Sequence, residues 1–163
     1  MVLVVRRLLA ICSACGLTAG LLIYVRSFLG TTMDGIMGWA IFLHVGVFLL
    51  LVPMYALEYS AIRGGTFFWK AFPKQAARAI QVLGLFCIFH FLFFLVQSHA
   101  SSPKIENGDY VLDDHGRTVR VISQSEYLSL KGSELRLFAT GWMFFYFVPA
   151  VYWWFPRNRQ PRT

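Results

Sequence analysis

Charged side chains are scarce in this sequence of 163 residues. Asp, Glu, Lys and Arg together make up only 14% of the chain, and 57% of it is hydrophobic. A soluble globular domain carries roughly 25% charged residues. The hydrophobic residues form long uncharged blocks, whereas a water-soluble core is built from short periodic segments. The composition therefore excludes a soluble fold and predicts a small membrane protein with a single domain, residues 1–163.

Recognisable catalytic motifs are also missing. The sequence contains no hydrolase, kinase, dinucleotide-binding or zinc-protease pattern, so we expect no enzymatic activity. It has no internal repeat and no charged pair in the middle of an apolar block, which disfavours a transporter. Pro53 and Pro149 each free a helix carbonyl, so a small solute or ion carrier stays open as an alternative.

Four uncharged blocks are long enough to cross a bilayer, whose core of ~30 Å needs roughly 20 helical residues. They cover residues 8–25, 35–57, 79–100 and 137–156. Only a helix satisfies its backbone polar groups within one such segment, and the first block is too long for a signal peptide. We therefore predict an all-α protein with a bundle of four transmembrane helices and a small extracytoplasmic cap at residues 101–136.

Positive charge separates to one side of the predicted bundle. The amino terminus, the second connection and the tail contain most of it, as Arg6, Arg7, Arg63, Lys70, Lys74, Arg78, Arg157, Arg159 and Arg162. The third connection is nearly neutral, with five basic and six acidic residues. The positive-inside rule then places both termini in the cytoplasm, and we expect a bacterial inner (plasma) membrane. The net charge of +7 is a topology signal, so no nucleic-acid partner is expected.

The second connection is also rich in aromatic residues. Residues 64–74 combine Phe and Trp with two lysines, which suits a segment lying in the headgroup layer. We therefore expect contact with anionic lipid at the inner face of the membrane.

The predicted cap has the composition of ordinary soluble sequence. Residues 110–112 and 118–122 are typical of short strands, joined through a turn in which Gly116 can take a positive φ. We expect a β-hairpin that packs on the following helix, because a lone hairpin is only marginally stable. Ser123 and Glu126 match a capping box, which predicts a helix start with a break near Gly132 before the fourth span.

The last third of the chain contains a set of glycine, aromatic and charged residues at fixed positions: Gly108, Tyr110, Leu112, His115, Gly116, Glu126, Tyr127, Arg136, Trp142, Met143, Phe145 and Tyr146. Together they resemble a pattern found in uncharacterised bacterial four-span inner-membrane proteins. His44 and residues 72–74 are weaker matches. The resemblance implies the architecture and no activity.

The three cysteines offer little redox chemistry. Cys12 and Cys15 form a C-x-x-C pair near the predicted cytoplasmic end, where the compartment is reducing, and Cys87 stands alone. Cys12, Gly16 and Gly20 instead form a stripe of small residues that allows close helix packing.

Two histidines lie within predicted spans. At about 1.5 Å per residue, His44 is ~14 Å and His90 ~16 Å from the outer ends of their helices. Tyr146 and Thr18 fall near the same depth. Ionisable residues inside a membrane usually face the bundle interior, so we predict a polar cluster of these four side chains.

This cluster has three interpretations. His44 and His90 could bind one b-type haem, with Gly38, Gly46 and Gly84 leaving room for the porphyrin. They could relay protons, or they could hold helices together through hydrogen bonds. We favour the hydrogen bonds and expect no cofactor, because a single histidine pair offers no transmembrane electron path.

Two further sets of side chains are candidates on the outer side. Carboxylates and imidazoles that could hold a divalent cation are Asp34, His99, Asp113, Asp114 and His115. Their spacing matches no known metal-binding motif, and residues 113–116 are of the types that ordinarily form a turn. Cap residues that could contact a partner are Tyr110, His115, Arg117 and Tyr127.

The sequence thus favours a non-catalytic accessory or interaction protein. Its outer cap would dock a membrane protein or an extracytoplasmic partner. An electron-transfer protein with haem between His44 and His90 is the alternative, and a small solute or ion carrier is the second.

Overall fold

The computed structural model describes residues 2–32, 34–66, 72–99 and 101–155. Within these ranges it has four long helices, each apolar and long enough to cross a membrane. They are α1 (Val2–Ser27), α2 (Met37–Arg63), α4 (Lys74–Ser98) and α5 (Gln124–Trp154). A single 3-10 turn, η1 (Asp34–Ile36), precedes α2. The predicted four-helix architecture is therefore present.

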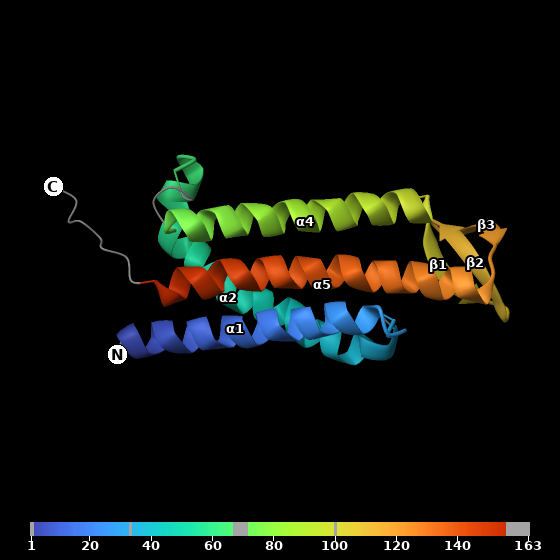
Figure 1. Cartoon of the computed structure of the whole chain (residues 1–163), viewed down its shortest axis with the longest axis horizontal. Helices are drawn as coiled ribbons and strands as arrows, with labels where there is room; N and C mark the ends of the chain where they lie inside the picture. The colour runs from blue at the N-terminus through green and yellow to red at the C-terminus, as the bar shows by residue number, and fades with distance from the viewer. Residues whose placement is uncertain (1, 33, 67–71, 100, 156–163) are drawn as a thin grey trace.

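Helix α5 is the centre of the bundle. It lies between α1 and α4, and α2 crosses behind it (Figure 1). Leu135, Ala139 and Thr140 of α5 are completely buried. By contrast, α1, α2 and α4 expose large apolar side chains on their outer faces, such as Phe42 and Val82. Such a continuous apolar surface suits contact with lipid.

The fourth helix departs from the prediction at its amino-terminal end. α5 is one continuous helix of 31 residues, without a break at Gly132. A Cβ atom on Gly132 would lie 3.3 Å from Nη1 of Arg136 and 3.6 Å from the carbonyl oxygen of Ser27. Gly132 thus lies inside the helix, facing the end of α1, and a Cβ atom there would make only ordinary van der Waals contact with Ser27. Helices α2 and α5 also continue through Pro53 and Pro149.

The cap is a three-stranded antiparallel sheet with the strand order β1-β2-β3. Its strands are β1 (Ser102–Glu106), β2 (Asp109–Asp114) and β3 (Arg117–Val121). The predicted hairpin corresponds to β2 and β3, and Gly116 has the expected positive φ of 87°. β1 was not predicted, although Asn107-Gly108, with φ of 51° and 92°, is a strong signal for a two-residue hairpin turn.

The cap packs on the start of α5, as predicted. Leu112 of β2 and Ile122, which follows β3, pack against Tyr127 and Leu130 of α5. Tyr110 of β2 lies beside them. The capping box is formed only in part. The hydroxyl of Ser123 accepts a hydrogen bond from the backbone N–H of Glu126 at 3.1 Å. The carboxylate of Glu126 does not reach back to the cap residue but pairs with Arg120 of β3.

The two ends of the bundle differ in character. The start of α1, the end of α2, the start of α4 and the end of α5 lie at one end, and the sheet lies at the other (Figure 1). This is the arrangement expected for four spans that cross in alternating directions. The tail from residue 156 and residues 67–71 of the aromatic connection lie outside the described residues.

Candidate functional site

Tyr146 of α5 occupies a slot between two glycines of neighbouring helices. Its hydroxyl donates a hydrogen bond of 2.7 Å to the carbonyl oxygen of Leu43 in α2. A Cβ atom on Gly46 would collide with this hydroxyl, and one on Gly16 of α1 would collide with the ring. Both glycines are therefore required by one aromatic side chain that joins three helices.

Gly20 continues the contact surface of α1. A Cβ atom there would lie 3.2 Å from the side chain of Met143. The predicted stripe of small residues is thus a packing surface at Gly16 and Gly20. Cys12, in contrast, is exposed, and Ser13 takes the buried position beside it.

His44 contacts α5. Its Nδ1 lies 3.0 Å from the carbonyl oxygen of Ala40 in the preceding turn of α2. Its ring meets the Trp142 ring edge to face at a centroid distance of 5.3 Å and that of Phe138 at 6.0 Å. The imidazole of His44 therefore packs between α2 and α5.

His90 lies at a different contact, between α4 and α1. Its Nε2 is 3.1 Å from the hydroxyl of Tyr24 in α1. The rings of Phe86 and Phe89 pack around it at 4.6 Å and 5.6 Å. Tyr24 was not anticipated from the sequence, because only a tertiary contact brings it to the histidine.

The four predicted cluster residues therefore do not share one hydrogen-bond network. The Tyr146 hydroxyl donates to the carbonyl oxygen of Leu43, the residue before His44, whereas His90 is hydrogen-bonded to Tyr24. Thr18 bonds within its own helix, to the carbonyl oxygen of Ala14 at 2.9 Å. The bonds of His90 and Tyr146 join neighbouring helices, as the hydrogen-bonding interpretation expects, whereas His44 and Thr18 bond within their own helices.

The packing around the glycines does not fit a haem between His44 and His90. Gly46 faces the hydroxyl of Tyr146, and a Cβ atom on Gly84 would lie 3.2 Å from the Phe144 ring. Side chains of α5 thus fill the space at two of the three glycines that were expected to admit a porphyrin. Gly38 has nothing within 4 Å of a Cβ position.

A polar network at the cap end of the bundle was missed by sequence reasoning. Gln97 of α4 donates to the hydroxyl of Ser129 at 3.3 Å and accepts from Ser133. Arg136 donates to the hydroxyl of Ser133 at 2.9 Å, and its guanidinium lies 4.9 Å from the ring centroid of Phe28. Residues 129, 133 and 136 are spaced so that they share one helix face, and this spacing is a sequence signal that could have revealed the polar network.

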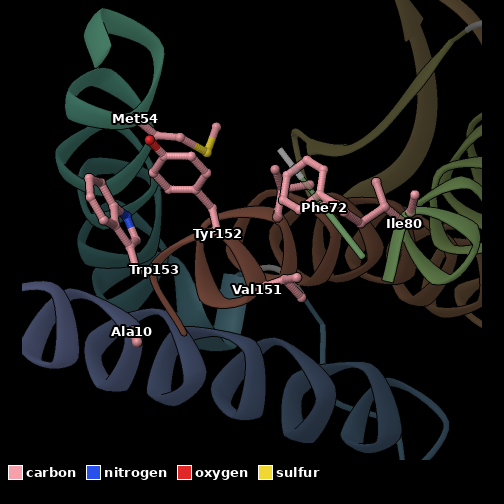
Figure 2. Packing of buried hydrophobic residues seen from close by; sticks show 9 residues of the cluster. Ala10, Met54, Phe72, Ile80, Val151, Tyr152 and Trp153 are labelled. Atoms are coloured by element: carbon pink, nitrogen blue, oxygen red, sulfur yellow. The ribbon is translucent and has the colours of Figure 1, made fainter. Parts of the chain in front are cut away.

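A buried carboxylate lies at the opposite end. Glu58 of α2 is only 3% exposed and accepts a hydrogen bond of 2.7 Å from the hydroxyl of Tyr152. Figure 2 shows Tyr152 and Trp153 of α5 directed toward Met54, with Ala10 of α1 below them. In the sequence Glu58 counts only as a charge of the second connection, but the fold places it inside the bundle.

The predicted metal ligands engage in other contacts. Asp113 pairs with Lys104 at 2.7 Å and accepts from the backbone N–H of Gly116 at 3.0 Å. Asp114 pairs with its neighbour His115 at 2.5 Å, and His99 is the left-handed cap residue of α4. The side chain of Asp34 lies outside the described ones. Among the described residues, no group of three or more His, Cys, Asp or Glu side chains is arranged so that it could hold a metal ion.

The predicted partner residues fall into two groups. Tyr127 is buried, and the half-buried Tyr110 packs beside it with the two ring centroids 4.9 Å apart. His115 and Arg117 are exposed at the turn between β2 and β3. Of the four, the two turn residues are the most exposed.

We expect acid to loosen the cap. The Lys104 ammonium and the N–H of Gly116 hold the pKa of Asp113 below its ordinary value, because both donate to the charged carboxylate. In the unfolded chain an aspartate has a pKa of about 4. Because the pKa of Asp113 is lower in the folded chain, its ionised form stabilises the fold at pH values above about 4. This stabilisation is lost as the pH falls through the pKa of the folded state. The Gly116 amide signal in an NMR titration should therefore shift at a midpoint below the ordinary pKa of an aspartate. Asp113→Asn should abolish that shift, and a midpoint at or above the ordinary value would contradict the pairing.

Comparison of the chain with protein-family models, curated proteins and solved structures gives no match.

Proposed function

We propose that this chain is a non-catalytic integral membrane protein whose outer cap docks an extracytoplasmic partner. Both termini are cytoplasmic in this proposal, and the helices lie in a bacterial inner membrane. The support is the charge distribution of the sequence. The cap lies at the opposite end of the bundle from the start of α1 and the end of α5, which agrees with this orientation (Figure 1).

One observation carries the docking proposal: β3 is an exposed sheet edge. All five of its residues are exposed, and Val119 and Val121 are 57% and 65% exposed. In the order β1-β2-β3 it pairs with β2 on one side only. An edge strand presents backbone N–H and C=O groups that can add a further strand. The partner that fits is an extended segment, with acidic side chains near the exposed Arg117.

A photo-crosslinking residue in place of Val119 tests this proposal in intact cells. We expect a single adduct whose crosslinked peptide is an extended segment of a protein exposed outside the cytoplasm. Ile105 in β1 is the matched control, because it is 58% exposed but lies on the opposite edge strand. Arg117→Glu should reduce the Val119 adduct, because it replaces the attractive charge by a repulsive one.

Three outcomes would overturn the proposal. Capture of the same proteins from Val119 and Ile105 would mean that β3 has no special role. An adduct unchanged by Arg117→Glu would remove the acidic partner. Capture of a cytoplasmic protein would reverse the orientation.

A further inference from the structure

The guanidinium of Arg136 points along α5 toward the cap. Side chains on a helix tilt toward its amino terminus, and Arg136 donates back to Ser133, one turn earlier, at 2.9 Å. Its Nη1 atom would be 3.3 Å from a Cβ atom on Gly132. The charged group therefore lies closer to the cap end of the bundle than its own backbone does.

This level is where two neighbouring helices end. Ser27, the last residue of α1, has its carbonyl oxygen 3.6 Å from the Cβ position of Gly132. Gln97, in the last turn of α4, bonds to Ser129 and Ser133. If the helices span a bilayer as proposed above, their ends mark the outer boundary of its apolar layer. The guanidinium then lies at the depth of the outer headgroups rather than in mid-membrane.

No carboxylate neutralises this guanidinium in the part of the chain that the structure describes. The nearby acidic residues have other partners: Glu134 pairs with Lys131 at 3.1 Å, and Glu126 pairs with Arg120. The carbonyl ends of α1 and α4 offset part of the charge, but they supply no full negative charge. The ring of Phe28 covers one side of the guanidinium.

We propose that Arg136 binds the phosphate group of an anionic phospholipid in the outer leaflet. A guanidinium has five N–H donors in a planar fork that matches phosphate oxygens. Only the bond to Ser133 uses one of them among the described residues. Phosphate is also the anion that the headgroup layer supplies at this depth. The inference rests on the proposed membrane placement but does not depend on the docking role of β3.

Lipid titration of the purified chain in detergent, followed by native mass spectrometry, tests the site. We expect phosphatidylglycerol to bind more tightly than phosphatidylcholine, whose ammonium would lie near the guanidinium. Arg136→Gln should weaken phosphatidylglycerol binding about tenfold, as expected for one lost charge-assisted contact. Arg26→Gln is the matched control, because Arg26 lies in the last turn of α1 at the same end and is exposed. It should leave this binding unchanged.

Two additional measurements keep the result decisive. Arg136→Lys retains the charge without the fork and should give an intermediate affinity, which is informative if Arg136→Gln does not fold. Inorganic phosphate should compete only weakly for the lipid site, because it lacks acyl chains.

Two outcomes would overturn the site: an equal loss of phosphatidylglycerol binding in the Arg136 and Arg26 variants, or equal binding of the two lipids to the unaltered chain. Strong binding of inorganic phosphate would instead assign it to a free anion. Crosslinking from Val119 reports on the docking proposal separately.

Discussion

Gly46→Ala is expected to destabilise the helix bundle by about 1–3 kcal/mol, the usual cost of overpacking a filled site. The new methyl group would collide with the hydroxyl of Tyr146, which is fixed by its bond to Leu43. Gly38→Ala on the same helix is the control, because nothing lies within 4 Å of a Cβ atom there. Denaturant unfolding of the detergent-solubilised protein measures the difference.

A double-substitution cycle makes this prediction specific. Without the hydroxyl, the nearest atom of residue 146 would be 3.4 Å from the Cβ of residue 46, which is an ordinary contact. Tyr146→Phe should therefore reduce the penalty of Gly46→Ala. It should not reduce the penalty of Gly16→Ala, because the Cβ of residue 16 collides with ring carbons. Equal coupling at both glycines would contradict the slot geometry.

Tyr152→Phe is expected to cost roughly 1.5–3 kcal/mol, the contribution of a hydrogen bond to a charged group. It removes the hydrogen bond of 2.7 Å that the Tyr152 hydroxyl donates to Oε1 of the buried Glu58 carboxylate. Thermal or denaturant unfolding of the purified protein would measure the loss.

Tyr59→Phe provides the control for this second substitution. Tyr59 lies next to Glu58 on α2 but is 51% exposed, so loss of its hydroxyl should change stability by less than about 0.5 kcal/mol. Equal effects of the two substitutions would show that the bond between Tyr152 and Glu58 contributes nothing to stability.

Local signals explain which features of the fold were predictable. The turn at Gly116 needs a positive φ, and glycine supplies it without strain. Ser123 starts α5 because its hydroxyl satisfies the free N–H of Glu126. β1 was missed although Asn107-Gly108 carries the corresponding turn signal, because its residues do not alternate clearly between apolar and polar types.

The candidate sites were less predictable for a physical reason. A helix that is apolar on nearly all sides carries no periodic signal that tells which side faces its neighbours. The depth of His44 and His90 could be counted along the sequence, but the rotation of α2 and α4 could not. The fold turns His44 toward Trp142 and His90 toward Tyr24, so the two histidines stabilise separate helix contacts.

The sequence by itself determined four long apolar helices and a polar cap, because both follow from composition and from hydrogen bonds between residues close in the chain. Only the tertiary structure decided that α5 is the central helix, that Gly16 and Gly46 enclose Tyr146, and that Arg136 lies beside the ends of α1 and α4. These features depend on side chains that are far apart in sequence and meet only when helices pack. Hydropathy measures the preference of each residue for a nonpolar environment, and it does not distinguish a lipid chain from a neighbouring helix.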